Sequence, residues 1–113
     1  MKLTRFEDLD CWKEARQLTR QVYGAVHQNP SWQRDMRLCS QIQSAAGSVM
    51  ANIAEGFVRR SNKEFMQFLF IAMSSAAEAQ SHLYIAVDQG MCRRTLLSLF
   101  TCKLTRRHES FPV

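Results

Sequence analysis

Apolar residues recur at steps of three and four along one stretch of the sequence, and this spacing constrains the fold more than any other feature. The positions are Phe65, Phe68, Ala72, Ala76, Ala79, Leu83 and Ala86. Residues at these steps share one face of an α-helix, so the stretch predicts a helix from about Asn62 to about Gln89. Ser61 and Glu64 have the spacing of a capping box, and Gly90 suits the C-terminal end of a helix.

Two earlier stretches repeat this periodicity. The first predicts a helix from about Asp8 to about Gln28, capped by Asp8, with Thr4 to Glu7 as a competing start. Its apolar face is Leu9, Trp12, Ala15, Thr19, Val22 and Val26. Asn29-Pro30-Ser31 then breaks the helix, because proline disfavours helical backbone at the residue before it.

The second of these stretches predicts a helix from about Arg34 to about Phe57. Its apolar stripe is Leu38, Cys39, Ile42, Ala45, Ala46, Val49, Ile53 and Phe57. Small residues over 44–48 would let a neighbouring helix approach closely, and Gly56 is expected to assist termination.

The remaining segment completes the predicted fold. Leu96, Leu97, Phe100 and Leu104 could line a fourth helix, short or atypical. Connections of a few residues make consecutive helices antiparallel neighbours. The sequence therefore predicts an all-α, antiparallel, up-down-up-down four-helix bundle that forms a single domain over residues 1–113.

Composition excludes several classes of protein. No stretch approaches the roughly 20 apolar residues of a membrane span, and the N-terminal residues have no apolar signal segment, so we expect a cytoplasmic protein with no membrane partner. The four cysteines form no Cys-x-x-Cys pair, which argues against a zinc site. A di-iron bundle needs Glu-x-x-His pairs, whereas Glu78 and His82 are four apart. We therefore expect no metal, no cofactor and no enzymatic activity.

The net charge of +5 is unevenly distributed along the sequence. Residues 1–56 hold seven Lys/Arg and six Asp/Glu, whereas residues 57–113 hold eight and four. The excess falls in two clusters, which are Arg59, Arg60 and Lys63, and then Arg93, Arg94, Lys103, Arg106 and Arg107. Clustered basic charge is typical of a surface that binds a polyanion, although a solvated basic face would show the same pattern.

A polar group adjoins the first of these clusters. Asn52 and Glu55 lie three residues apart, and Glu55 and Arg59 lie four apart in a favourable ion-pair order. One interpretation is structural: Asn52 and Glu55 connect the second predicted helix to the start of the third. The other is functional: they orient Arg59 and Arg60 toward a partner.

The same region resembles a known family. Its block Asn52-Ile53-Ala54-Glu55-Gly56-Phe57 is followed by Arg59-Arg60-Ser61 and Lys63-Glu64-Phe65, and the opening Phe6-Glu7-Asp8-Leu9 agrees as well. Together they resemble the bacterial S23 proteins, encoded within intervening sequences of 23S ribosomal RNA genes, over about residues 6–90. The resemblance implies an antiparallel four-helix bundle, often assembled as a ring of five, and no catalytic residues. The family is also related in fold to the accessory variability protein of diversity-generating retroelements, a basic pentamer that binds nucleic acid.

These observations favour an oligomeric protein that associates with RNA or DNA. Arg59, Arg60 and Lys63 would contact phosphates, and Arg93, Arg94, Arg106 and Arg107 would add to the field. Apolar residues beside the predicted seam are expected to be exposed and to form the interface of a homo-oligomer; they are Trp32, Met66, Phe70 and Met73. The resemblance implies that this cyclic homo-oligomer is a pentamer. The alternative is an assembly module whose partner is another protein, with no role for nucleic acid.

Overall fold

The structure, a computed structural model, describes residues 4–94, and every regular element in that range is helical. A 3-10 turn, η1 (Phe6–Asp8), precedes the long helix α1 (Asp10–Gln28). A short helix, α2 (Ser31–Arg34), leads into α3 (Met36–Phe57), and α4 (Asn62–Asp88) follows. The three long helices begin and end within about two residues of the predicted positions. The protein is thus an all-α bundle, as the periodicity predicts.

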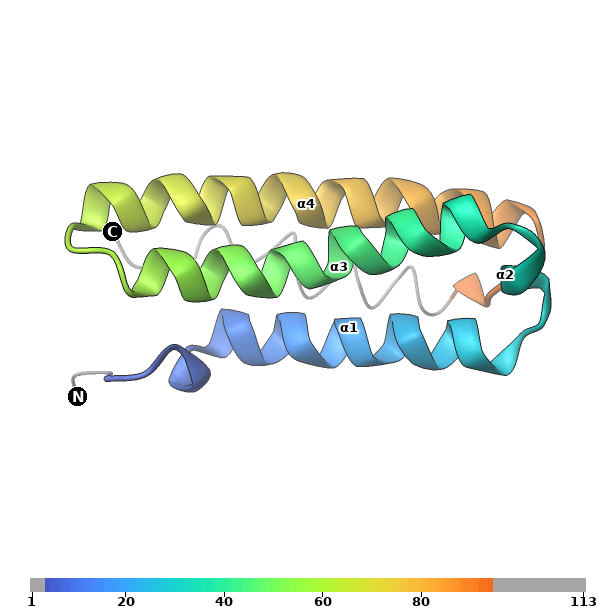
Figure 1. Cartoon of the computed structure of the whole chain (residues 1–113), viewed down its shortest axis with the longest axis horizontal. Helices are drawn as coiled ribbons and strands as arrows, with labels where there is room; N and C mark the ends of the chain where they lie inside the picture. The colour runs from blue at the N-terminus through green and yellow to red at the C-terminus, as the bar shows by residue number, and fades with distance from the viewer. Residues whose placement is uncertain (1–3, 95–113) are drawn as a thin grey trace.

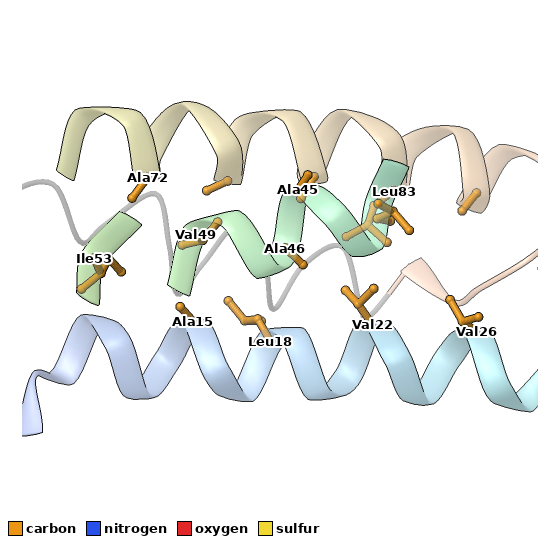
Figure 2. Close-up of a cluster of buried hydrophobic side chains, with 14 of the residues drawn as sticks. Ala15, Leu18, Val22, Val26, Ala45, Ala46, Val49, Ile53, Ala72 and Leu83 are labelled. Carbon is orange, nitrogen blue, oxygen red and sulfur yellow. The ribbon is translucent and has the colours of Figure 1, made fainter. Parts of the chain in front are cut away.

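The long helices alternate in direction, and α3 lies between α1 and α4 (Figure 1). Side chains from all three helices meet in the core, where Leu18 and Val22 of α1 face Ala46 and Val49 of α3, and Leu83 comes from α4 (Figure 2). Many of these buried residues are alanines, so the helix backbones can approach closely. The predicted fourth long helix, with Leu96, Leu97, Phe100 and Leu104, lies outside the described residues.

The buried faces differ from the predicted faces by small rotations. Leu18 and Leu69 are buried at 1% and 0% exposure, although neither belongs to the predicted stripes. Thr19 and Phe68, which do belong to them, are only half-buried. Adjacent positions such as 18 and 19, or 68 and 69, fit a helical period almost equally well, and the choice depends on where the neighbouring helix lies.

The start of α1 corrects one prediction. The helix begins after Leu9 with no side chain capping it, so Asp8 is not its cap. Asp8 instead ends η1, where its carboxylate lies 3.6 Å from Nε of Arg5. The backbone amide of Leu9 donates to the carbonyl of Phe6, which closes the 3-10 turn.

The other helix ends follow local sequence chemistry. Asp35 caps α3, because its carboxylate accepts a hydrogen bond from the Leu38 amide at 3.1 Å. At the end of α4, Gly90 has φ +72°. The amide of Gly90 donates to the Val87 carbonyl and that of Met91 to the Ala86 carbonyl, the two bonds of a Schellman motif. The sequence predicts this glycine end.

Candidate functional site

The turn between α3 and α4 carries the first predicted basic cluster, and Gly56 determines how close the two helices are there. Gly56 is the second-last residue of α3, as expected, but it has no positive φ and so does not end the helix as a left-handed cap. A Cβ atom at this position would lie 2.6 Å from the Phe68 Cβ of α4. Glycine is required here because α4 packs directly against the backbone of α3.

Arg59 is engaged within this turn. Its Nη2 donates to Oε2 of Glu55 at 3.3 Å, and its guanidinium carbon lies 4.7 Å from the centre of the Phe68 ring. Both members of the ion pair are partly exposed, so the pair contributes little to stability. These two contacts hold the Arg59 side chain across the α3–α4 contact, as the structural interpretation of Glu55 requires.

The two other basic residues of the cluster have no such partners. Arg60 and Lys63 are exposed and form no ion pair with another residue in 4–94. Lys63 follows the cap of α4, where the Oγ of Ser61 accepts from the Glu64 amide at 3.2 Å. The predicted capping box is therefore present, with one change: Glu64 Oε1 accepts from the Ser61 hydroxyl, also at 3.2 Å.

Asn52 has a different role from the one that the structural interpretation assigns. Its Nδ2 donates within α3, to the carbonyl of Ser48 at 2.8 Å and to Ser48 Oγ at 3.0 Å. Ser48 Oγ in turn lies 2.9 Å from Ser75 Oγ, in the middle of α4. Asn52 thus connects α3 to the middle of α4 through two serine hydroxyls, and not to the start of that helix.

A second polar cluster lies at the opposite end of the bundle, where α2 packs. The carbonyl oxygen of Met91 accepts two side-chain hydrogen bonds, from Trp32 Nε1 at 3.1 Å and from Asn29 Nδ2 at 3.0 Å. Trp32 is 0% exposed, so the expectation that it lies on an exposed interface is wrong. The indole is buried because α2 folds over the bundle end and brings its N–H to a backbone acceptor.

This arrangement separates the predicted basic clusters. Arg93 and Arg94 come two and three residues after Met91, just beyond the end of α4 at Asp88. Arg59, Arg60 and Lys63 lie where α4 begins. Because α4 has 27 residues, with a rise of about 1.5 Å each, the clusters are roughly 40 Å apart. They cannot form one compact site on a single chain. Arg106 and Arg107 lie outside the described residues.

The outward face of α4 exposes two pairs of large apolar side chains, with the exposed residues Ser74, Glu78 and Ser81 between them. Phe70 is 59% exposed, Ile71 48%, Tyr84 48% and Ile85 46%. Phe70 is one of the predicted interface residues, whereas Met66 and Met73 are half-buried at the sides of this face. Ile71, Tyr84 and Ile85 were not predicted. The sequence does contain a signal for these three residues. Between residues 65 and 87 the only formal charge is that of Glu78, so few charged side chains are available for the exposed face of this helix.

The described residues contain no group of three or more His, Cys, Asp or Glu side chains placed to hold a metal ion. Glu78 and His82 are the two residues whose spacing was considered for a metal site. Oε2 of Glu78 lies 3.5 Å from Nε2 of His82, on one side of α4. No helix between residues 4 and 94 is both long enough and apolar enough to cross a membrane.

Comparison with known protein families identifies a match. The model of the family described as 23S rRNA-intervening sequence protein matches residues 7–106, which is most of the chain. The matched range extends beyond residue 90, where the resemblance in the sequence was expected to end. No curated protein matches the chain.

Proposed function

The chain belongs to the 23S rRNA-intervening sequence protein family, and from this premise we propose that it is a non-enzymatic binding protein. In this proposal, copies of the chain associate through α4, and the assembly binds RNA or DNA through its basic surface clusters. The cytoplasm, where ribosomal RNA is abundant, is the compartment that fits this activity.

The observation that carries the proposal is the outward face of α4, defined by Phe70, Ile71, Tyr84 and Ile85. A surface helix normally keeps charged and polar residues toward water, whereas these four exposed side chains of α4 are large and apolar. Contiguous exposed apolar patches mark interfaces in most soluble proteins. Between residues 65 and 87 the only formal charge is that of Glu78, so ion pairs can contribute little to a contact on this face.

A second copy of the chain is the occupant that we propose for this face. Every copy carries the same two exposed apolar pairs, one at 70–71 and one at 84–85, so a repeated contact between copies can close into a ring. The resemblance to the S23 proteins implies five copies, and a homopentamer is therefore the proposed assembly. A ring would also repeat each basic cluster, so that weak phosphate contacts add up through avidity.

Light scattering tests the assembly. We expect the wild-type protein at micromolar concentration to have five times the 13.1 kDa mass of one chain. The double variant Phe70→Glu, Ile85→Glu should be monomeric, because charge on the apolar face opposes its burial. The matched control is Met36→Glu with Val58→Glu, two exposed apolar positions away from that face, and it should assemble normally. A monomeric wild type would reject the proposal, as would a double variant that still assembles.

A mobility shift with ribosomal RNA fragments at two salt concentrations tests the binding activity. Contacts to phosphates release counterions, so affinity for RNA should fall steeply as salt rises. The competing function is an assembly module for another protein, which is favoured by the contacts that engage Arg59. Capture of one protein that is insensitive to salt, without a shift of RNA or DNA, would support that alternative and overturn the nucleic-acid proposal.

A further inference from the structure

Two contacts between helices mark the middle of the bundle and divide its charged residues into two halves. The Thr19 hydroxyl, which donates to the Ala15 carbonyl at 2.8 Å, also lies 3.3 Å from the Ala46 carbonyl of α3, and the Ser48 and Ser75 hydroxyls lie 2.9 Å apart. Residues 4–18 and 48–74 therefore form one half, which contains the α3–α4 turn. Residues 20–46 and 76–94 form the other half, which contains α2. We call them the turn half and the α2 half.

The turn half is electrically balanced despite its basic cluster. Its cations are Arg5, Lys13, Arg16, Arg59, Arg60 and Lys63, and its anions are Glu7, Asp8, Asp10, Glu14, Glu55 and Glu64. Two of the cations form ion pairs within the same half, Arg5 with Asp8 and Arg59 with Glu55. A polyanion that approached this half would meet as many carboxylates as basic groups.

The α2 half holds the charge surplus of the described residues. Its cations are Arg20, Arg34, Arg37, Arg93 and Arg94, against Asp35, Glu78 and Asp88. Four of these arginines lie at the end of the bundle itself, and all four are exposed with no ion pair to a residue in 4–94. Asp35 caps α3, so its carboxylate already accepts a backbone hydrogen bond.

The four arginines come from three parts of the chain that the fold holds together. Arg34 ends α2, Arg37 lies in the first turn of α3, and Arg93 and Arg94 follow α4. The Met91 carbonyl links the last of these parts to the first, through its hydrogen bonds from Trp32 and Asn29. Because Trp32 is fully buried, this hydrogen bond is shielded from water, and it holds the backbone two residues before Arg93 against α2.

We infer that this group of Arg34, Arg37, Arg93 and Arg94 is the chain's binding site for the phosphodiester backbone of a nucleic acid. The inference rests on the proposed function and changes its location, since the α3–α4 turn becomes a structural element. Arginine suits the role because its planar guanidinium donates two parallel hydrogen bonds to a phosphate and stays charged at any physiological pH. Backbone contacts of this kind bind without strong sequence preference.

The test compares two variants that each lose four positive charges. One replaces Arg34, Arg37, Arg93 and Arg94 by alanine, and the matched control replaces Arg5, Arg59, Arg60 and Lys63 by alanine. Lys103, Arg106 and Arg107 stay in both. The probes are a single-stranded RNA, a single-stranded DNA of the same sequence, and vesicles of equal parts phosphatidylcholine and phosphatidylserine. Affinity is measured by fluorescence polarisation over a range of salt, and helical content and assembly by circular dichroism and light scattering.

The α2-half variant should bind nucleic acid at least about ten-fold more weakly than the wild type, and its salt slope should be shallower by about 3, since each phosphate contact on a single strand contributes about 0.7. The turn-half control should stay within about three-fold of the wild type. The RNA and DNA probes decide which backbone is preferred.

Each other outcome overturns a specific statement. A wild type that binds neither nucleic acid rejects the proposed function. A wild type that binds, with an α2-half variant that binds equally well, rejects the location alone, as does a larger loss in the turn-half control. Tighter binding to the vesicles than to nucleic acid through the same arginines rejects the ligand class. If the fourfold variant loses helical content, Arg34→Gln with Arg37→Gln and Arg93→Gln with Arg94→Gln test the two pairs separately.

Discussion

The backbone of Gly56 in α3 lies so close to Phe68 in α4 that a Cβ atom on residue 56 would be 2.6 Å from the Phe68 Cβ. Neither atom is the flexible end of a side chain, so the helices themselves would have to move apart. Replacing Gly56 by alanine should lower the free energy of unfolding by about 1–3 kcal/mol, even though alanine favours a helix by about 1 kcal/mol.

Gly47 provides the control, because it lies in the same helix with no atom within 4 Å of a built Cβ. Gly47→Ala should raise the free energy of unfolding by up to about 1 kcal/mol. Urea denaturation followed by circular dichroism measures both. If the two variants change stability in the same direction, the close approach at Gly56 is not the cause.

The hydrogen bond from Trp32 Nε1 to the Met91 carbonyl should have a measurable effect on stability. Trp32→Phe removes the donor and leaves a void in a fully buried site, so we expect a loss of about 1–3 kcal/mol. Trp12→Phe is the matched control, since Trp12 is half-buried beside Phe6. Thermal unfolding should show a much smaller shift for the control. Equal shifts would contradict the role of this bond.

The cap of α4 depends on the Ser61 side chain. Ser61→Ala should cost about 0.5–2 kcal/mol, and Ser61→Asp should retain most of the stability, because aspartate also accepts at this position. Ser74 is the control within the same helix: its hydroxyl donates to the Phe70 carbonyl, which already lies within the helix ladder. Ser74→Ala should therefore have little effect in the same urea titration.

Burial raises the pKa of the Cys92 thiol above the ordinary value for cysteine, because the charged thiolate loses solvation. A raised pKa in the folded state means that Cys92 favours folding below the pKa of the unfolded chain. This stabilisation is lost as the pH rises from the pKa of the thiol in the unfolded chain to its pKa in the folded protein. Alkylation requires the thiolate. Iodoacetamide should therefore label Cys92 more slowly in the folded protein than in urea, from about pH 8 to about pH 10. Mass spectrometry of the peptide containing Cys92 measures both rates, and identical pH profiles would contradict the prediction.

Much of the fold could be predicted from the sequence. The 3.6-residue periodicity gives the three long helices, and the Ser61–Glu64 spacing and Gly90 give both ends of α4. These signals succeed because each depends on residues that are close in sequence and on backbone geometry that is the same in every helix. The exposed Phe70 could also be predicted, because it lies off the apolar stripe.

The candidate sites were predicted less well, because they depend on which residues distant in sequence meet. Trp32 follows a proline in a connection, which suggests exposure, yet it is buried against Met91, 59 residues later. Arg59 belongs to a basic run, yet it pairs with Glu55 and lies on Phe68. Arg34 and Arg37 lie in the near-neutral part of the sequence, so they were not predicted to belong to a basic cluster.

The sequence by itself determined the three long helices, their order and both ends of α4, since these follow from local hydrogen bonding and from the burial of one face of each helix. Only the tertiary structure decided which residues fill each face and which charges lie together. Helix packing brings Gly56 against Phe68, and the hydrogen bonds to Met91 bring Arg93 and Arg94 to α2. Such contacts depend on distances between helices, and no periodicity within one helix specifies where its neighbour lies.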